Sequence, residues 1–377
     1  MKKLLLAIMS LVLLLGGCSS SSDTFTALLS GEVESLDPAN ASAYSTYSLI
    51  SDIYTGLTRI DDENNQIMLG ASDITISDDG LTYTATLRDD IKWVDNTGTE
   101  VGDVTANDYV FAYQRMVDPN VASVYSYIFE NIKNATEIGR GEMEVTELGV
   151  KALDDYTLEI TLTKPTPYFE NLLAFGSYVA QPEGAYEAYG DDYATSSDTM
   201  WYSGAYYVTK YDPDYTIELK KNNLYFNSDK VEVENLDYRL NADDTSRLNA
   251  FLNGEVDYAE IDSVENYNAT KEEGVDHNRH TLFSYYFVLN TTDNTPTSDP
   301  NLRKALSLGF DRTTVVNSVF DDMNTPIEYI IPENLTPSTY DGLEYRDIAG
   351  DSLTSYDEDA ANQYFDKYME ENGISDR

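Results

Sequence analysis

The sequence predicts a mixed α/β fold, because its hydrophobic residues follow a strand-like period in some stretches and a helical period in others. Tyr83, Ala85 and Leu87 alternate with polar residues, which is the pattern of a half-buried strand. Further along, Thr105 followed by Asp108 is typical of a capped helix start. The helical spacing is then kept by Tyr109, Tyr113, Met116 and Val117, and the pair Asp118-Pro119 ends the helix.

The same signals predict the other elements in order along the chain. Asp78-Asp79-Gly80 is typical of a hairpin turn between two alternating runs. A short helix closes at Gly254, another begins at Asp299-Pro300, and a last one runs from Asp357 to Gly373. Strands are predicted at 25–32, 148–152, 156–162, 216–220, 256–261 and 281–290.

Composition and charge narrow the class of protein. The chain has 377 residues, 41% of them hydrophobic, which is enough for two or three domains with a sizeable core. The formal net charge is −43, from 24 basic and 67 acidic residues. Such a chain repels nucleic acid and anionic head groups over about 10 Å at 0.1 M salt. We therefore expect no nucleic-acid partner, and interpret the acidic excess chiefly as a solvated surface.

The amino terminus has the pattern of a targeting segment. Lys2-Lys3 is followed by an apolar run from Leu4 to Leu15, too short to span a membrane comfortably, so residues 1–17 are interpreted as a signal peptide. Gly16-Gly17-Cys18 resembles the lipidation site of bacterial lipoproteins. Cys18 is the only cysteine, which excludes disulfides and CxxC metal sites. We expect a lipidated tether at 18–23 and an extracytoplasmic, membrane-anchored protein, on a Gram-positive surface rather than in a periplasm.

Two polar segments could be mistaken for metal sites. The run Asp61–Asn65 lacks the alternating ligands, the glycine and the distal glutamate of an EF-hand calcium loop, and we interpret it as a turn. His277 and His280 lie three residues apart beside Asp276, but Gly274 and the following strand favour a loop there. Two histidines alone make a poor metal site. We expect no metal, no cofactor and no catalytic residues.

Several ordered motifs resemble one protein family. They include Lys92-Trp93 at a strand end, Val104-Thr105-Ala106-x-Asp108 at a helix start and Gln114-Arg115-x-x-Asp118-Pro119 at its end. Ser35-Leu36-Asp37-Pro38 and the stretch from Asn301 to Arg312 add to the set. Together they resemble the oligopeptide-binding lipoproteins of ABC importers, the extracellular solute-binding protein family 5.

That resemblance implies the type II periplasmic-binding-protein-like fold, two lobes with an extra inserted domain. It places lobe I at 24–57 and 180–284, the inserted domain packed on it at 58–179, and a partial lobe II at 285–377. Members of the family continue beyond the equivalent of Asn372-Gly373 to complete the second lobe. We therefore expect the second lobe to be incomplete here.

The resemblance also implies ligand-contacting positions. It places Ser42, Ala43 and Tyr44 beside the ligand backbone, although a loop leading into a helix explains them equally well. Tyr125 is a cleft candidate, with core packing as the alternative. Other family positions for ligand contacts correspond here to Glu260, Ile261, Asp262, Tyr285 and Tyr286. The acidic pair around Ile261 suggests a preference for basic ligand side chains, or simply a solvated strand end.

The function implied is capture of short peptides for an ABC permease by a monomeric receptor that performs no chemistry. Held by its main chain, a peptide would be recognised largely independently of its sequence. Alternatives are the same fold binding nickel, haem or a sugar, a glycosidase with paired carboxylates, and a peptide-sensing surface lipoprotein that serves no transporter. No carboxylate spacing in the sequence singles out the enzyme.

Overall fold

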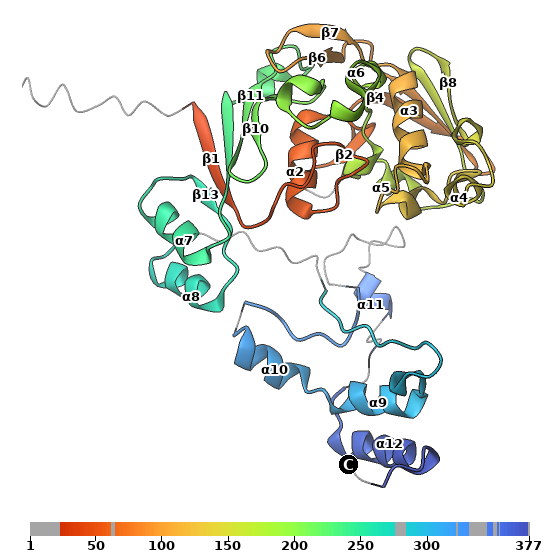
Figure 1. The fold of residues 1–377 in the computed structure, drawn as a ribbon, viewed down its shortest axis with the longest axis vertical. Coiled ribbons are helices and arrows are strands. Elements are labelled where there is room, and N and C mark those ends of the chain that lie inside the picture. Colours follow the sequence, from red (N-terminus) through yellow and green to blue (C-terminus); the bar gives the residue numbers. More distant parts are fainter. Residues whose placement is uncertain are drawn as a thin grey trace, which may run out of the picture. The chain divides into compact units, whose positions relative to one another are not determined.

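Figure 1 shows the chain in the computed structural model, which describes residues 23–61, 65–275, 284–321, 323–331, 345–349, 353 and 355–375. The chain divides into two units, residues 1–261 and residues 262–377, and each is described by itself. The signal peptide, Cys18, Asp276, His277 and His280 lie outside the described residues.

The amino-terminal strand lies inside a sheet whose other strands come from the far end of the first unit. β1 (Thr24–Leu29) pairs in parallel with β12 (Asn235–Leu240) on one side and β13 (Tyr258–Ala259) on the other. Antiparallel pairing adds β11 (Thr216–Lys221) and β10 (Tyr206–Asp212), which gives the order β10-β11-β12-β1-β13. The last four residues of β1 are all buried, as expected for a strand covered on both faces.

A second sheet of the first unit is antiparallel throughout. Its order is β4 (Ala71–Ile76), β5 (Thr82–Leu87), β9 (Thr157–Thr161) and β8 (Val150–Asp154). β5 confirms the predicted alternation, because Tyr83, Ala85 and Leu87 are buried and the threonines between them are not. The hairpin turn is also confirmed: Gly80 adopts φ 69°, in the left-handed region that favours glycine.

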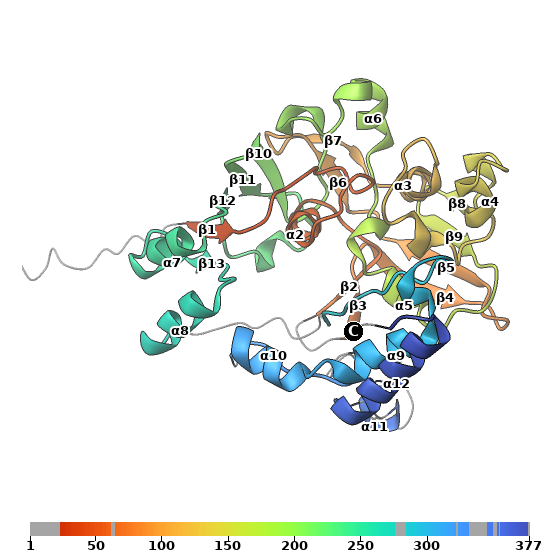
Figure 2. The ribbon, with the colours of Figure 1, turned by 60° about the horizontal axis from the view of Figure 1, so that its bottom comes forward.

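The predicted capped helix is α3 (Ala106–Val117). The carboxylate of Asp108 accepts hydrogen bonds from the main-chain N–H of Thr105 at 2.8 Å and from its hydroxyl at 3.1 Å, so the helix start is held as expected. The helix ends at Asp118, before Pro119. Its buried face packs against β8 and β9, beside which it is drawn in Figure 2.

Shorter elements complete the first unit. Two ribbons pair β2 (Thr58–Ile60) with β3 (Gln66–Met68), and β6 (Lys92–Val94) with β7 (Glu100–Asp103). The α-helices are α2 (Tyr44–Ile53), α4 (Ala135–Gly139), α5 (Phe169–Leu172), α6 (Glu183–Tyr189) and α7 (Asp244–Leu252). The 3₁₀ turns are η1 (Ser126–Phe129), η2 (Val145–Glu147), η3 (Gly176–Tyr178), η4 (Gly190–Asp192), η5 (Ser197–Thr199) and η6 (Ser228–Lys230).

One hydrophobic cluster runs through both sheets of the first unit. It includes Leu158 of the second sheet, Leu219 of the first, and the aromatic residues Tyr54 and Trp93. The rings of Tyr54 and Trp93 meet edge to face with centroids 6.2 Å apart. Because one core joins the sheets, the first unit is stabilised as a whole. The predicted boundaries between lobe I and the inserted domain stay a prediction.

The regular elements in the described part of the second unit are helices and one 3₁₀ turn. They are α8 (Val264–Glu272), η7 (Pro296–Ser298), α9 (Pro300–Gly309), α10 (Arg312–Val319), α11 (Tyr345–Ala349) and α12 (Glu358–Glu371). The predicted cap of α9 is confirmed, since the Asp299 carboxylate accepts from the N–H of Asn301 at 2.7 Å. α9 and α12 pack together, and the Asn301 side chain donates to Glu371 at 2.9 Å.

The prediction of a strand at 281–290 is wrong for its described part, residues 284–290, which form no strand. A strand needs a neighbour for its N–H and C=O groups. Among the described residues the last strand is β13, so β-favouring side chains alone do not produce one at 284–290. The predicted strands at 25–32 and 256–261 are shorter than expected, ending at Leu29 and reduced to Tyr258–Ala259.

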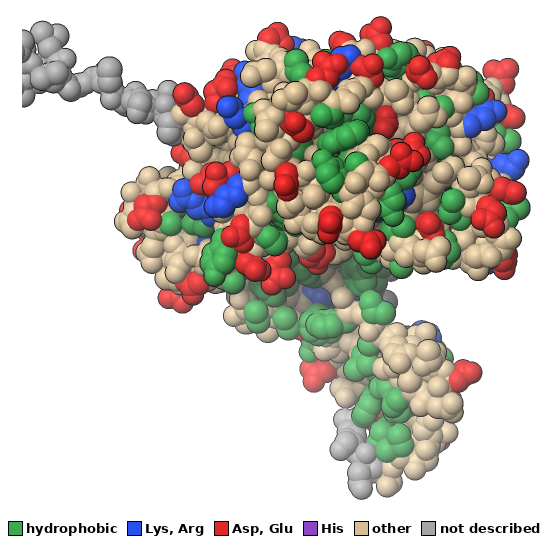
Figure 3. All heavy atoms as spheres, turned by 45° about the horizontal axis from the view of Figure 1, so that its top comes forward, with side chains coloured by type: hydrophobic (Ala, Val, Ile, Leu, Met, Phe, Trp, Pro, Cys, Tyr) green, Lys and Arg blue, Asp and Glu red, His purple; other side chains and the backbone are tan. Residues whose placement is uncertain are grey.

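Acidic side chains are dispersed over the surface rather than gathered in one place. Figure 3 shows them scattered across the face in view, with few Lys and Arg side chains among them. Dispersed carboxylates stay hydrated, which agrees with interpreting the acidic excess as a solvated surface.

One carboxylate, that of Asp52, is shielded from solvent and makes the stability of the protein depend on pH. Asp52, near the end of α2, accepts a hydrogen bond from the Tyr238 hydroxyl of β12 at 2.9 Å. Burial raises the pKa of Asp52 from an ordinary 3.8 to about 6, and the hydrogen bond offsets part of that rise. The folded protein therefore holds this proton at pH values where the unfolded chain has lost it.

We predict that Asp52→Asn stabilises the protein at neutral pH but not at acidic pH. Because the pKa of Asp52 is raised in the folded state, the wild-type free energy of unfolding falls as pH rises from about 4 to about 6. Above that range the ionised carboxylate keeps the wild type less stable by the full amount. The variant should gain on the order of 2 kcal/mol at pH 7.5, measured by urea unfolding, and the gain should vanish below about pH 4. Asp214→Asn, an exposed control in the turn between β10 and β11, should change stability by less than about 0.5 kcal/mol at either pH. A gain that is constant from pH 4 to 7.5 would contradict the prediction.

Candidate functional site

The stretch Asp37–Tyr44, here called the entry segment, leads from a buried turn into helix α2. The main-chain N–H of Asn40 donates to the carbonyl of Asp37 at 3.0 Å, and the N–H of Ala39 donates to the Asp37 carboxylate at 3.0 Å. The Asn40 side chain donates to the other carboxylate oxygen at 2.8 Å. Asp37 is 2% exposed, so a buried carboxylate organises the first half of the segment.

The second half of the entry segment presents an uncapped helix start. Ala43 is the N-cap of α2, with extended backbone (φ −81°, ψ 147°), and no side-chain cap bonds the helix start. The first-turn N–H groups of a helix have no partner within the helix and lie at its positive end. They are donors for a carbonyl or carboxylate oxygen of a ligand. Ser42 and Ala43 are both partly exposed.

Tyr125 lies beside this segment. Its hydroxyl donates to the main-chain carbonyl of Ser42 at 3.4 Å, although Tyr125 comes from the turn before η1, far along the chain. The Ser42 hydroxyl donates in turn to the Glu34 carboxylate. Two positions that were predicted separately, Ser42 and Tyr125, are thus in contact.

An aromatic cluster of four residues surrounds Tyr125: Tyr47, Tyr125, Tyr127 and Phe175. The rings of Tyr47 and Tyr125 meet edge to face at 5.3 Å, and Phe175 lies 5.1 Å from Tyr47 and 5.4 Å from Tyr125. Tyr127 is 61% exposed and Phe175 38%, whereas Tyr47 and Tyr125 are partly buried. The cluster therefore offers open ring surface next to the entry segment.

Tyr47 connects the cluster to the entry segment by a hydrogen bond. Its hydroxyl donates to the carbonyl of Ala41 at 3.2 Å and lies 2.7 Å from the Ser177 hydroxyl. A hydroxyl has one proton, so with Tyr47 donating to Ala41 the Ser177 hydroxyl is the donor in the second contact. Burial raises the pKa of Tyr47 to about 12, and the bond from Ser177 offsets part of that rise. The Tyr47 hydroxyl stays protonated at neutral pH.

Glu260 and Ile261 lie at the end of the first unit, and Glu260 is held by it. Its carboxylate accepts from the N–H of Ser30 at 2.6 Å and from the Ser30 hydroxyl at 2.7 Å. Arg247 donates to the Glu260 carbonyl at 2.8 Å. Glu260 is therefore a structural link between the ends of β1 and β13, and its predicted ligand contact stays a prediction. Ile261 is partly exposed, and its predicted ligand contact also stays a prediction.

Asp262, Tyr285 and Tyr286 belong to the second unit. Asp262 is exposed, and Tyr285 and Tyr286 are 89% and 68% exposed in the extended segment that follows residue 283. Their exposure agrees with a surface role and excludes a core role for them within the second unit. Ligand contact by these residues stays a prediction.

Sequence reasoning missed Tyr47, Tyr127, Phe175 and Glu34. Tyr127 follows Tyr125 at a spacing of two, so the run Ala122–Tyr127 held a weak signal for it. Tyr47 and Phe175 come from α2 and from the residue before η3, and no local pattern connects them. Only the folded chain brings them together.

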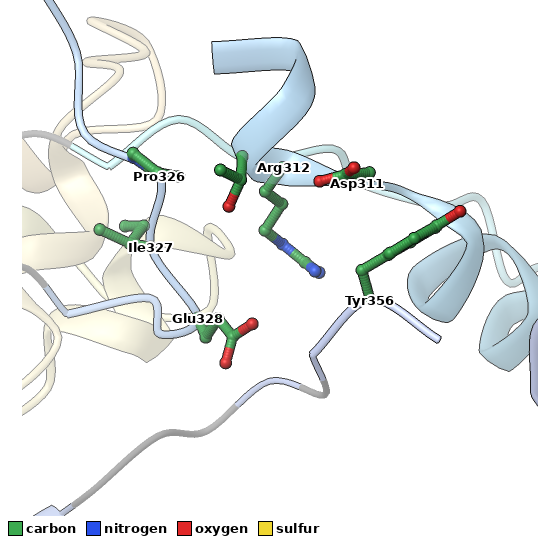
Figure 4. A pocket seen from close by; sticks show the side chains of 7 residues that line it. Asp311, Arg312, Pro326, Ile327, Glu328 and Tyr356 are labelled. Atoms are coloured by element: carbon green, nitrogen blue, oxygen red, sulfur yellow. The ribbon is translucent and has the colours of Figure 1, made fainter. Parts of the chain in front are cut away.

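A separate cavity lies within the second unit, with a volume of about 190 Å³. Figure 4 shows the Arg312 side chain projecting into the space between Glu328 and Tyr356. The Asp311 carboxylate beside it is engaged as the cap of α10, accepting from the N–H of Thr314 at 3.0 Å. This cavity contains none of the predicted site residues.

The described residues contain no group of His, Cys, Asp and Glu side chains that could hold a metal ion. Across the same part of the chain, no helix is long and apolar enough to cross a membrane. Asp61 and Asn65, the described ends of the rejected calcium loop, bond each other instead, with the N–H of Asn65 donating to Asp61 at 2.8 Å.

The motifs and the fold both lead to one family. The family described as bacterial extracellular solute-binding proteins, family 5 Middle, matches residues 66–376, most of the chain. This chain belongs to that family. Its members are extracytoplasmic solute-binding proteins, and the resemblance seen in the sequence is confirmed.

Individual relatives agree with the family. The chain is 34% identical over 300 residues to the periplasmic oligopeptide-binding protein OppA of Escherichia coli (strain K12), covering 78% of this chain and 54% of the relative. It matches a solved structure of Listeria monocytogenes OppA bound to peptide with a TM-score of 0.81 and 29% identity, covering 95% of this chain and 70% of that one. The pheromone receptor PrgZ, solved for its mode of peptide binding, matches with a TM-score of 0.81 and 28% identity, covering 93% and 68%.

These likenesses confirm the predicted fold class, the type II periplasmic-binding-protein fold of the family. The chain spans about half the length of the Escherichia coli relative, at 54%. The activity, the ligand and the partners of the whole protein are therefore proposals.

We predict that Tyr47→Phe destabilises the first unit by about 1–2 kcal/mol, because the partly buried Ala41 carbonyl loses its donor and Ser177 loses its acceptor. Urea unfolding at pH 7.5 measures the change. Tyr127→Phe is the matched control, since that ring is 61% exposed, and it should change stability by less than about 0.5 kcal/mol. Equal effects of the two substitutions would show that the Tyr47 hydroxyl does not secure the entry segment.

Proposed function

We propose that this chain captures oligopeptides by their main chain and serves an ABC peptide importer. The observation that carries the proposal is the likeness over 95% of the chain to a family member solved with a bound peptide. Ser42, Ala43, Tyr44, Tyr125, Glu260, Ile261, Asp262, Tyr285 and Tyr286 are the proposed ligand-contacting residues.

The geometry of the first unit suits an extended peptide. An uncapped helix start supplies main-chain N–H donors, and the aromatic cluster beside it supplies open ring surface. Peptide carbonyls can bond such donors whatever the peptide sequence, while side chains rest on apolar or hydrated surface. Tyrosine rings suit this role because they combine area with a polar tip at low entropic cost.

The proposed setting is the outer face of a cell membrane. Cleavage before Cys18 and lipidation of its thiol would anchor the chain there, with residues 18–23 as a tether and ABC permease subunits as partners. After cleavage 22 basic and 67 acidic residues remain, a net charge of −45. We propose a monomeric receptor without enzymatic activity, on a Gram-positive surface.

A second candidate is a peptide sensor that serves no transporter. The likeness to the pheromone receptor PrgZ favours it specifically. The two candidates share the same ligand and differ in the partner, so deletion of the permease separates them. Peptide uptake that needs both proteins supports the importer, whereas an unchanged uptake supports the sensor.

We predict that short peptides bind the full chain with measurable heat and raise its melting temperature, because ligands that bind only the folded state stabilise it. Isothermal calorimetry with peptides of two to eight residues, against nickel, haem and sugars as controls, is the measurement. Peptide masses recovered unchanged after incubation exclude hydrolysis. Binding of a control ligand in place of peptides, or of neither, would overturn the proposed function.

We predict that Ala43→Pro weakens peptide binding about tenfold or more, because proline removes the main-chain N–H of the N-cap residue. The native φ of −81° suits proline, so the fold should persist, which the melting temperature checks. Ser42→Ala, the matched control, removes a side chain but no N–H and should leave affinity within about threefold. If Ser42→Ala proves the more damaging change, recognition of the peptide by the main chain of this segment is wrong.

A further inference from the structure

We infer that Arg115 is a positioning residue for peptide capture, acting through Asp37 to hold the entry segment in its binding shape. The inference rests on the proposed function. It concerns a buried ion pair that lies outside the proposed ligand-contacting residues. Its consequence is that affinity for peptides depends on a side chain no ligand touches.

The contact between the two residues is bidentate. Nη1 and Nη2 of Arg115 donate to the two carboxylate oxygens of Asp37 at 2.9 and 2.8 Å. Arg115 is 8% exposed and Asp37 2%. Parallel bonds of this kind fix the plane and the direction of the carboxylate as well as its position. A lysine could satisfy the charge but not the geometry.

Arg115 is itself immobilised from other sides. Its guanidinium lies over the ring of Tyr186, 4.6 Å from the centroid, and 5.5 Å from that of Tyr193. Nη1 also donates to the side chain of Gln181. Tyr186 lies on α6, and Gln181 and Tyr193 lie just before and after that helix in the sequence. Helix α3 and the α6 region therefore together set the position of the guanidinium that holds Asp37.

Asp37 in turn orients the rest of the entry segment through hydrogen bonds. Both of its carboxylate oxygens accept a second hydrogen bond, one from the N–H of Ala39 at 3.0 Å and one from the Asn40 side chain at 2.8 Å. The direction of the chain toward Ser42 and Ala43 is therefore set by where Arg115 holds the carboxylate.

The last turn of α3 also supports the other half of the site. Met116, next to Arg115, accepts a weak bond from the Ser123 hydroxyl at 3.9 Å, and the N–H of Ala122 donates to the Asp118 carbonyl at 3.2 Å. These contacts fix the start of the loop that carries Tyr125. The end of α3 thus fixes the distance between the entry segment and Tyr125, and small errors in such spacing cost affinity.

The experiment compares peptide affinity with stability in variants of the full chain. Asp37→Asn and Arg115→Lys break the bidentate contact, and Asn40→Ala weakens the same turn at an exposed position where folding is not at risk. Tyr109→Phe is the control: its hydroxyl, buried on the same helix, donates to Thr55 at 3.1 Å and not to the entry segment. Calorimetry gives the Kd well below the melting temperature, and amide exchange follows residues 39–44.

We expect the Kd to rise about tenfold or more in Asp37→Asn and Arg115→Lys and about threefold in Asn40→Ala, with faster amide exchange at 39–44 in all three. Tyr109→Phe should lower the melting temperature yet change the Kd less than about twofold. The double variant Asp37→Asn/Arg115→Lys should lose no more affinity than the worse single variant, because both act through one contact.

Three results would overturn the inference. The first is that Asp37→Asn, Arg115→Lys and Asn40→Ala all bind peptides with the affinity of the wild type. In that case the proposed function stands and the inference is wrong. If Asp37→Asn and Arg115→Lys fail to fold, unchanged Kd and exchange in Asn40→Ala are sufficient to reject it. The third, a wild type that binds no peptide, removes the proposed function and the inference together.

Discussion

Taking a guanidinium and a carboxylate out of water costs several kcal/mol for each ion, and the first unit does so at Arg115 and Asp37. The pair is tolerable because each oxygen of Asp37 has further donors and the guanidinium is covered by aromatic rings. Removing either partner would leave an unpaired buried charge, so the two residues depend on each other. A hydrophobic pair could stabilise this spot equally well, but it could not orient a turn.

The rest of the proposed site is organised around that turn. Tyr47 bonds the carbonyl of Ala41, Tyr125 bonds the carbonyl of Ser42, and Ala43 begins the helix without a capping side chain. Each of these contacts uses the main chain of the segment. The proposed site is thus built from backbone groups held by side chains, as the proposed capture of peptides by their main chain requires.

Local patterns predicted the elements that depend on local interactions. β5 and α3 follow their hydrophobic periods, and the Thr105–Asp108 cap forms as expected. The stretch 284–290 has the same β-favouring character but forms no strand, because pairing is a property of two segments and only one is described there. Resemblance placed Ser42 and Tyr125 in one site, whereas Phe175 and Tyr47 meet only through tertiary packing, which no local period encodes. Resemblance also placed Glu260 among the ligand contacts, whereas its two bonds to Ser30 are visible only in the folded chain.

The position of β1 has a consequence for how the protein is made. Thr24 pairs with Asn235, and Ala27 pairs with Tyr258, so β1, the first strand among the described residues, pairs with segments near the end of the first unit. Such high contact order slows folding and leaves an open strand edge during the delay. Export as an unfolded chain, which the proposed setting implies, would suit this topology, because the sheet containing β1 cannot close before β12 and β13 are available to pair with it.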